Sequence, residues 1–269
     1  MEKTQEIERC LITNFRRRIY SKFVSAVKKY SLIEEGDRIA VCISGGKDSF
    51  VMAKCLQELK RHGVDNFDLV YLVMDPGYKE SDLKKITDNA DLLGLPIQVF
   101  STDIFKIATS LQDGSPCYLC ARMRRGALYS QAKSLGCNKI ALGHHYDDII
   151  ETTMMGILYN GQVQTMLPKC PSDNFENMSL IRPMCLVRER DVIAFSAFHG
   201  LDFIRCACPM TGGGCASGEG KRAATKKLIA ELEKQDEHIP DNIFKSVSNV
   251  HLGGVYEYKD KNGVRHKNV

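Results

Sequence analysis

Three short stretches of this 269-residue chain combine residue types and spacings that suit chemistry. The first is Ser-Gly-Gly-Lys-Asp-Ser, residues 44–49, which follows an apolar run at 38–43 and precedes a helical pattern. Two glycines let the backbone approach an anion closely, and a helix N-terminus presents free N–H groups to it. Asp48 repels a polyphosphate unless a cation lies between them, so it suits Mg²⁺. The stretch predicts a phosphate-binding loop for a nucleotide with magnesium.

The spacing separates this loop from a Walker A loop, which requires G-x-x-x-x-G-K-[ST]. Here Asp48 follows Lys47, and Val41 stands where the first glycine belongs. The order S-G-G-x-D-S after a strand instead resembles the loop of the PP-loop ATP pyrophosphatases. That resemblance implies cleavage of ATP between its α and β phosphates, adenylation of a substrate oxygen and release of pyrophosphate. Lys47 and Asp48 are then the candidate catalytic residues. The ATP-binding loop residues are Ser44, Gly45, Gly46, Lys47, Asp48 and Ser49.

The second stretch is Leu-Gly-His-His-Tyr-Asp-Asp, residues 142–148, directly after another short apolar run. Histidines and carboxylates gathered at the end of a strand are costly unless they bind something. Gly143, His144 and Asp148 are therefore expected to contact ATP or its Mg²⁺, with His145 beside them. Zinc is the competing interpretation, although no H-E-x-x-H spacing is present. The third interpretation is that the cluster has only a structural role.

The third stretch is Cys117-Tyr-Leu-Cys120, which suits a redox pair, half of a zinc site or half of an iron–sulfur site. The other closely spaced cysteines are Cys206 and Cys208, followed by a proline, with Cys215 beyond. A 4Fe-4S cluster with three cysteine ligands fits this set. Two ligands come from the C-x-x-C pair, and the third is Cys208, with Cys206 as the alternative. Zinc and unliganded thiols remain the competing interpretations.

The composition points to a soluble globular protein. Hydrophobic residues make up 43% and charged residues 26%, which is average for that class. No uncharged apolar run approaches the ~18 residues that cross a bilayer, and no secretory signal is visible, so the cytoplasm is expected. The 11 cysteines are an odd number, which excludes complete internal pairing. Isolated cysteines in apolar runs, such as Cys42, Cys55 and Cys185, are expected to pack in the core.

Two basic segments stand out against a net charge of +4. Residues 1–30 carry eight Lys and Arg against three Glu, and residues 115–139 carry five Lys and Arg with no acid. Such local excesses favour contacts with a polyanion, although a solvated helix face is the plainer alternative. The candidate contacts, which would be RNA-binding residues if the polyanion is RNA, are Arg16, Arg17, Arg18, Arg122, Arg124 and Arg125.

The elements that must position these residues alternate between strand and helix from residue 38 to about 200. This alternation predicts an α/β fold with a doubly wound, mostly parallel, five-stranded sheet and added helices at both termini. One amphipathic helix is expected over 5–30. Because ligands bind beyond the carboxyl ends of parallel strands, Met74, which ends a predicted strand, is expected to pack on adenine, with core packing as the alternative.

Three segments follow from this alternation. The first is a basic helical segment at 1–36. The second is the PP-loop domain at 37–205, which carries the C-x-x-C pair. The third, 206–269, contains a cysteine- and glycine-rich loop, two helices and a tail expected to be mobile.

Four blocks, taken in order, resemble one family. They are EEGDRIAVCISGGKDS, CYLCARMRRGALY, KIALGHHYDDIIET and LIRPMCLVRERD. They look like the corresponding blocks of the TtcA-type tRNA 2-thiocytidine synthetases, and the resemblance runs to about residue 208. It implies ATP-dependent transfer of sulfur to C2 of cytidine 32 in tRNA, with an oxygen-sensitive 4Fe-4S cluster. Cys117 and Cys120 correspond to the first two cluster ligands.

The resemblance also implies partners: the tRNA anticodon stem-loop and a cysteine desulfurase or other sulfide donor. It implies no membrane and leaves a homodimer open. The sequence departs from the family at 206–209, Cys-Ala-Cys-Pro, where many relatives have a second C-x-x-C. Two other functions therefore stay in view. One is a PP-loop enzyme that thiolates another tRNA base or modifies a small molecule, and the other is a redox or iron sensor without enzymatic activity.

Overall fold

The computed structural model describes the backbone of residues 2–63, 66–110, 116–204, 220–260 and 262–269, and their side chains except at 108–110 and 116–119. By their internal contacts the residues form two compact units. The first comprises Met1–Asp148 and Leu167–Glu219, and the second comprises Ile149–Met166 and Gly220–Val269. These units are defined by contacts within the chain, whereas the three segments expected from the sequence were defined by motifs. The three-segment division stays a prediction.

The first unit is built on a six-stranded sheet in the order β3-β2-β1-β4-β6-β5. Its strands are β1 (Arg38–Ile43), β2 (Asp68–Asp75), β3 (Ile97–Ser101), β4 (Lys139–Ala141), β5 (Lys169–Pro171) and β6 (Ser179–Ile181). Neighbours are parallel except at one edge, where β5 runs antiparallel to β6. The predicted doubly wound, mostly parallel sheet is confirmed. The sixth strand, β5, was not expected because its three residues are too few to show a strand pattern, and they include a proline, which only an edge strand tolerates.

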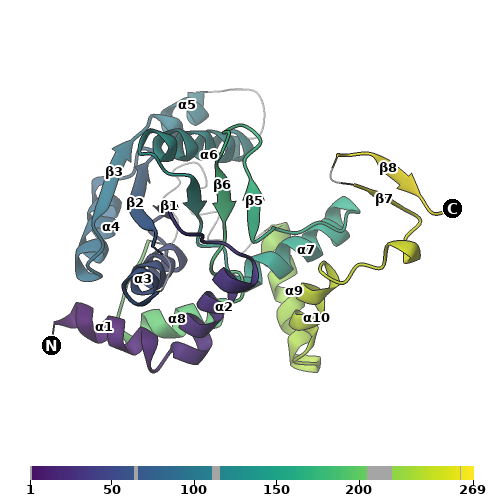
Figure 1. Ribbon diagram of the computed structural model, residues 1–269, viewed down its shortest axis with the longest axis horizontal. Coiled ribbons are helices and arrows are strands. Elements are labelled where there is room, and N and C mark those ends of the chain that lie inside the picture. Colours follow the sequence, from purple (N-terminus) through teal and green to yellow (C-terminus); the bar gives the residue numbers. More distant parts are fainter. Residues whose placement is uncertain (1, 64–65, 111–115, 205–219, 261) are drawn as a thin grey trace. The chain divides into compact units, whose positions relative to one another are not determined.

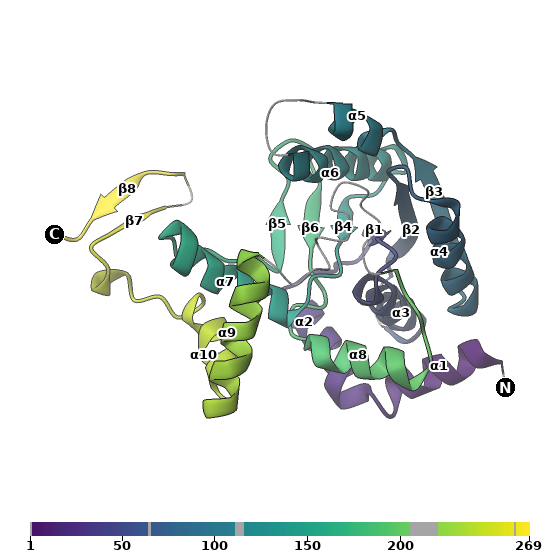
Figure 2. The same ribbon diagram turned by 180° about the vertical axis from the view of Figure 1, so that it is seen from behind.

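Helices cover both faces of this sheet (Figures 1 and 2). Successive residues of a strand point to opposite faces. Ile39, Val41 and Ile43 of β1 pack in one core cluster with residues of α1, α2, α3, α4 and α8. Ala40 and Cys42 pack in a second cluster with α6. The helices are α1 (Lys3–Ile12), α2 (Ser21–Lys29), α3 (Lys47–His62), α4 (Glu80–Leu92), α5 (Ile104–Ser110), α6 (Pro116–Ser134), α7 (Tyr146–Asn160) and α8 (Glu189–Phe198).

The N-terminal segment is not the single α-helix expected over 5–30. A π-helix, η1 (Arg16–Tyr20), lies between α1 and α2. The apolar residues here recur every four positions, and all five are buried: Leu11, Phe15, Ile19, Phe23 and Val27. An α-helix has 3.6 residues per turn, so such a series would drift around its surface. The wider π turn and the break before it keep the series on the buried side.

The isolated cysteines lie in the core, as predicted. Cys42, Cys55 and Cys185 are buried. Burial raises the pKa of Cys42 to about 12 and that of Cys185 to about 12. The thiolate is the reactive form of cysteine. These thiols are therefore inert packing groups rather than candidates for chemistry.

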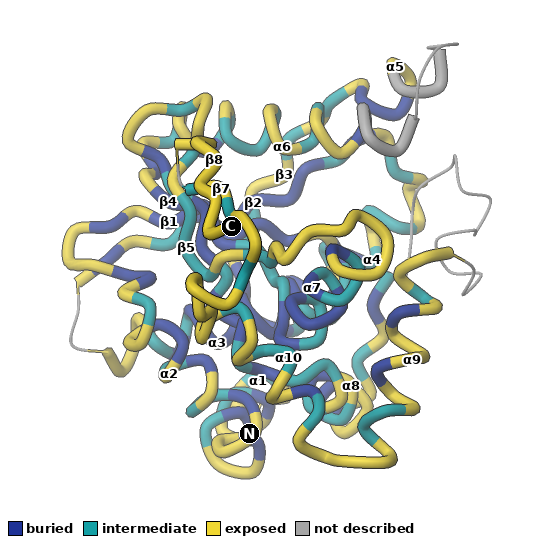
Figure 3. The backbone as a smooth tube through the Cα atoms, turned by 90° about the vertical axis from the view of Figure 1, so that its right-hand side faces the viewer, coloured by how far each residue is buried: buried dark blue, intermediate teal, exposed yellow. Residues whose placement is uncertain are grey.

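The second unit contains the part of α7 from Ile149 onward, with α9 (Lys221–Gln235) and α10 (Ile239–Ser246). Arg222 of α9 lies 3.0 Å from the carboxylate of Glu151 on α7. Most of α9 is exposed or half-buried (Figure 3), and its two buried residues, Thr225 and Ile229, are four positions apart. The tail expected to be mobile contains a 3₁₀ turn, η3 (Leu252–Gly254), and a two-stranded antiparallel hairpin, β7 (Glu257–Lys259) with β8 (Arg265–Lys267). Among the described residues no helix is long and apolar enough to cross a membrane.

Candidate active site

The chemistry-bearing stretches meet at one edge of the sheet. The chain runs outward from β1 to β2 and β3, then returns to place β4 on the other side of β1. Ligands of doubly wound sheets bind at such a reversal, beyond the carboxyl ends of the strands. Residues 44–49 follow β1, and residues 142–148 follow β4, its parallel neighbour. The topology therefore brings together the two stretches that the sequence singled out.

The phosphate loop is held by its own polar groups. Gly45 has φ +87°, which favours glycine, and Gly46 is the N-cap of α3. The Ser49 hydroxyl donates to the Gly46 carbonyl at 2.8 Å and accepts the Ser44 N–H at 3.1 Å. Ser49 is buried. It closes the loop in this structure rather than facing a ligand, so its predicted contact with ATP stays a prediction.

Lys47 and Asp48 open α3 and form ion pairs at the loop. The Lys47 ammonium lies 3.0 Å from Asp48 Oδ2 and 2.9 Å from Oε1 of Glu189, at the start of α8. Burial lowers the pKa of Lys47, but the charges of Asp48 and Glu189 outweigh burial and raise that pKa above its ordinary value. Lys47 is therefore a permanent cation at the place where phosphates are expected.

Glu189 belongs to a second group of contacts that the sequence did not single out. Asp147, at the start of α7, accepts the Glu189 N–H at 2.6 Å and pairs with Arg188 Nε at 3.1 Å. A carboxylate in this position satisfies the free N–H groups of a helix N-terminus. The starts of α3, α7 and α8 are thereby tied together. The sequence signal was the charged run Arg188-Glu189-Arg190-Asp191 at a predicted helix start, but it carries no information about its partner.

His145 and Asp148 form a reciprocal cap at the start of α7. The His145 N–H donates to Asp148 Oδ2 at 3.0 Å, and the Asp148 N–H donates to His145 Nδ1 at 3.3 Å. This is the arrangement of a capping box. The other ring nitrogen of His145, Nε2, lies 3.8 Å from Asp48 Oδ1. Asp148, predicted to contact ATP or Mg²⁺, holds the helix start with one oxygen.

Two close approaches fix the loop against its surroundings. A Cβ on Gly143 would lie 2.9 Å from Ser49 N and 3.0 Å from the Asp48 carbonyl carbon. A Cβ on Gly45 would lie 2.6 Å from Cγ1 of Ile204 and 2.9 Å from Cγ1 of Ile86. Such distances are shorter than ordinary van der Waals contacts between carbon atoms. The structure thus requires glycine at both positions.

The site fits a divalent cation at Asp48. Its Oδ1 atom is buried and has no hydrogen-bond partner in the described part of the chain. A buried carboxylate oxygen left unpaired is costly, and carboxylate oxygens are the ligands that Mg²⁺ prefers. Asp48 therefore suits Mg²⁺ bridging to phosphates. His144 is half-buried and directly follows Gly143, which lies against the start of α3. Its predicted contact with ATP or Mg²⁺ stays a prediction.

Cys120 lies beside the end of β2. It is buried in a cluster with Met74, Ile104 and Phe105. Cys117 precedes it by three residues on the backbone of α6. The Cys117 side chain lies outside the described residues. Met74, which the sequence offered as an adenine contact or a core residue, is itself buried in this cluster.

Cys206, Cys208 and Cys215 lie outside the described residues. The structure does describe the chain up to Ile204. The Ile204 N–H donates to the Gly45 carbonyl of the phosphate loop at 3.2 Å. Cys206 follows two residues later. The described residues contain no group of three or more metal-ligating side chains, and the predicted third ligand, Cys208 or Cys206, stays a prediction. Thiols on α6 and after Ile204 are nevertheless the soft donors that suit an iron–sulfur cluster.

The predicted RNA-binding arginines differ in their surroundings. Arg18 lies 3.7 Å from Asp191 and packs over the Phe15 ring at 4.5 Å. Arg124 is half-buried and bonds to the Tyr78 hydroxyl, whose pKa is raised because the ring is buried. The remaining four are exposed: Arg16, Arg17, Arg122 and Arg125.

A doubly wound sheet with Ser-Gly-Gly-Lys-Asp-Ser at its reversal point defines a class of nucleotide-binding protein. A family model described as the PP-loop domain matches residues 14–207, and the chain belongs to that family. Within it, the chain is 38% identical to the tRNA-cytidine(32) 2-sulfurtransferase of Pelobacter propionicus, over 87% of this chain and 86% of that protein. It is 37% identical to the enzyme of the same name from Vibrio cholerae, over 97% and 86%. The chain is a member of the tRNA-cytidine(32) 2-sulfurtransferase family.

A solved structure shares the fold. The U34-tRNA thiolase NcsA from Methanococcus maripaludis, determined with its 4Fe-4S cluster, superposes with a TM-score of 0.65. The match covers 86% of this chain and 79% of that one, at 20% sequence identity. At this identity the likeness concerns the fold alone, and it agrees with the sheet described above.

Proposed function

We propose that this protein is an ATP-dependent tRNA sulfurtransferase that replaces the C2 oxygen of cytidine 32 with sulfur. Its relatives carry this name over most of the length of the chain. The structural observation that carries the proposal is the hydrogen bond from Ile204 to Gly45. It ties the start of the cysteine-bearing segment to the phosphate loop, so ATP chemistry and sulfur chemistry have a common place to meet.

The first step is adenylation of the base. The N–H groups at the start of α3 and the Lys47 ammonium hold the phosphates of ATP. The C2 oxygen forms a bond to the α phosphorus, and the bond from that phosphorus to the bridging oxygen of the β phosphate breaks. Pyrophosphate leaves. Mg²⁺ held by Asp48 would offset the negative charge on the phosphates.

The second step replaces oxygen by sulfur. A sulfide nucleophile forms a bond to C2, and the C2–O bond breaks, so AMP leaves with the oxygen. Cys117, Cys120 and Cys208, or Cys206 in its place, would hold the 4Fe-4S cluster. When bound, the cluster supplies an open, thiophilic iron on which sulfide is carried. The sulfur comes from a cysteine desulfurase or another sulfide donor.

The base must leave its stack to reach the site, which costs least in a loop. Arg122, Arg124 and Arg125 directly follow the C-x-x-C pair and guide the phosphates of the anticodon loop. Arg16, Arg17 and Arg18 face the stem. Because tRNA is the substrate, we place the protein in the cytoplasm.

The test is nucleoside mass spectrometry of tRNA from a strain that lacks the gene. We expect 2-thiocytidine to disappear, to return with the wild-type gene, and to stay absent with Asp48→Ala. The Asp48→Ala protein should keep its melting temperature and its iron, which shows that only adenylation is lost. Unchanged 2-thiocytidine in a strain with no second copy would sink the assignment to cytidine 32. Loss of a different thionucleoside would move the activity to another tRNA base.

A further inference from the structure

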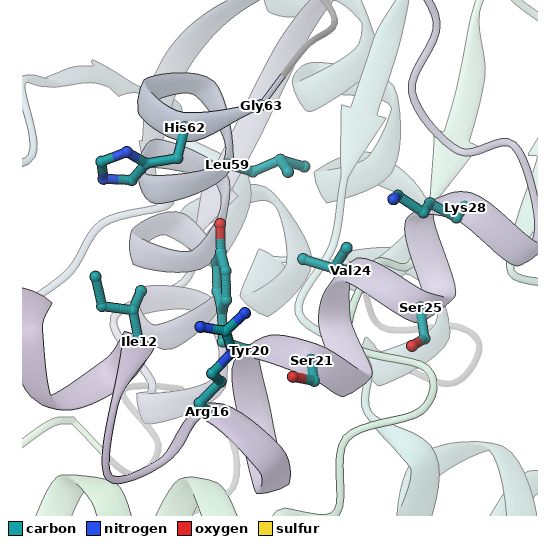
Figure 4. A pocket seen from close by; sticks show the side chains of 10 residues that line it. All are labelled: Ile12, Arg16, Tyr20, Ser21, Val24, Ser25, Lys28, Leu59, His62 and Gly63. Atoms are coloured by element: carbon teal, nitrogen blue, oxygen red, sulfur yellow. The ribbon is translucent and has the colours of Figure 1, made fainter.

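A groove of about 800 Å³ lies in the first unit, away from the phosphate loop (Figure 4). Its walls come from the end of α1, the π-helix η1, the length of α2 and the last turn of α3. π-Helical turns are rare, and they occur frequently at functional sites. Here the π turn contributes Arg16 and Tyr20 to the groove.

The lining combines apolar and hydrogen-bonding side chains. Val24 and Leu59 provide apolar surface between the helices, and Ser21 and Ser25 add hydroxyls along α2. Arg16 and Lys28 lie toward the two ends of this line of residues. The permanent charges of the lining, on Arg16 and Lys28, are both positive.

These two cations are not neutralised by the protein. In the part of the chain that the structure describes, neither Arg16 nor Lys28 pairs with a carboxylate. The nearby acids are already engaged: Glu8 lies 2.7 Å from Lys54, and Glu58 lies 2.9 Å from Arg61. The groove therefore carries uncompensated positive charge, which attracts an anion.

The separation of Arg16 and Lys28 suits a ligand that carries several anionic groups in series. Arg16 and Lys28 are 12 residues apart, which corresponds to at most about 18 Å, the value for a continuous α-helix. Phosphates spaced along a chain can meet these two cations without either long side chain bending toward the other. A nucleic-acid backbone presents phosphates in series, with riboses between them that suit an apolar surface.

The helix α3 connects the groove to the phosphate loop and fixes the distance between them. Lys47 opens α3 at the phosphate loop, and His62 closes it at the groove. The 16 residues of this helix span roughly 22–24 Å. An RNA bound at both places would put its reacting base at one end of α3 and a more distant part of its backbone at the other.

We infer that this groove binds the phosphate backbone of the tRNA stem as a second RNA contact, separate from the mouth of the active site. The inference rests on the proposed function, since it takes the partner to be tRNA. It goes further by assigning Lys28, Ser25 and Tyr20 to RNA binding and by placing them with Arg16 in one groove.

The experiment measures the affinity of the cluster-loaded, full-length protein for tRNA across a salt series. Arg16→Gln combined with Lys28→Gln removes both groove charges. Ser25→Glu keeps them but adds a carboxylate inside the groove. Lys22→Gln is the control, because Lys22 is also exposed on α2 but does not line the groove. All four proteins should bind ATP equally, which shows that they are folded.

We expect the double variant to bind tRNA about tenfold more weakly at low salt. Its slope of log K against log salt should shrink by about 1.8, as for two lost phosphate contacts. Ser25→Glu should weaken binding similarly, and kcat/KM for tRNA should fall with the affinity. Lys22→Gln should behave as wild type.

If the groove variants bind and thiolate tRNA as the Lys22→Gln control does, the groove is not an RNA contact, although the proposed function stands. If wild type binds no tRNA at any salt concentration, the proposed function fails first. If the variants keep tRNA affinity but lose only sulfur transfer from a protein donor, while free sulfide still works, the groove docks an acidic protein and the inference is overturned.

Discussion

At the scale of single residues, the site is a set of opposite charges that neutralise one another before any ligand arrives. Lys47 pairs with both Asp48 and Glu189, and Asp147 pairs with Arg188. In the proposed function, ATP would compete with these carboxylates for Lys47. Glu189 therefore influences what the phosphate loop accepts, although it lies 142 positions away in the sequence.

Glu189→Gln tests this influence. Removing one negative charge near the loop should let metal-free pyrophosphate bind about tenfold more tightly, which corresponds to ~1.4 kcal/mol. The rate of AMP formation should fall, because Lys47 loses the partner that orients it. Isothermal titration with pyrophosphate measures the first effect, and a radiolabelled ATP assay measures the second. Glu189→Asp, which keeps the charge, should stay near wild type, and equal pyrophosphate affinity in all three proteins would contradict the idea.

At the scale of elements, the loop depends on contacts between backbones. Gly143 of the β4–α7 connection touches the first turn of α3, and Ile204 touches Gly45. Neither contact involves a group that does chemistry. The first contact fixes the position of Asp48, and the second fixes the position of the chain just before the cysteine-bearing segment. The geometry of the site therefore depends on the neighbouring elements as well as on the loop.

Gly143→Ala should destabilise the protein by about 2 kcal/mol, because the new methyl group meets backbone that has no room to move. Adenylation should fall further than stability, since Asp48 is displaced. Gly126→Ala on α6 is the matched control: a Cβ there meets nothing within 4 Å, and alanine favours a helix over glycine. Chemical denaturation compares the two. Equal stabilities for the two variants would show that the close approach does not matter.

Much of this arrangement was predictable from the sequence, for a physical reason. The phosphate loop is a local motif, since Ser44–Ser49 contains its own hydrogen bonds and begins its own helix. The alternation of strands and helices is also local, and it predicted the sheet. The role of Glu189 was not predictable, because an ion pair between distant residues leaves no pattern in either stretch. Asp148 shows a second limit, because the sequence offered it as an ATP contact but gave no sign that it also caps α7; its contact with ATP stays a prediction.

The N-terminal segment shows the same limit at the scale of an element. Its amphipathic pattern predicted a helical segment with one buried side, and the buried residues recur every four positions. It did not predict the π turn at Arg16–Tyr20 that such a spacing requires, because a helical pattern in sequence is assigned to an α-helix by default.

At the scale of the whole molecule, the proposed function assigns ATP binding and sulfur delivery to separate residues. Cys120→Ala should lose the cluster and yet bind ATP normally, because the thiol does not belong to the phosphate loop. Asp48→Ala should do the reverse. Iron and acid-labile sulfide, measured after anaerobic purification, should be about four of each per wild-type chain. Loss of iron in Asp48→Ala, or its retention in Cys120→Ala, would show that the two functions share residues.

The second unit carries a further prediction, for a second copy of the chain. Its described residues include exposed apolar side chains that are close in sequence, namely Ile157, Leu158 and Val163, the last 68% exposed. Where such side chains form one patch, they mark a protein interface. We expect a homodimer by light scattering and a monomer for Val163→Glu. A wild-type monomer at micromolar concentration would rule this out, and Lys234→Glu, a charge change on exposed α9, serves as the control.

The mutual pairing of Lys47, Asp48 and Glu189 has a consequence for selectivity among the many phosphate compounds of a cell. An unpaired lysine on a helix N-terminus would retain inorganic phosphate, sugar phosphates and product pyrophosphate alike. In this loop two carboxylates stand beside one ammonium, so a bare anion meets more repulsion than attraction. A triphosphate that brings its own divalent cation reverses that balance, because the cation satisfies Asp48 while the phosphates take Lys47. If ATP binds here as proposed, we expect the resting loop to favour the metal complex of ATP over phosphate compounds that carry no cation.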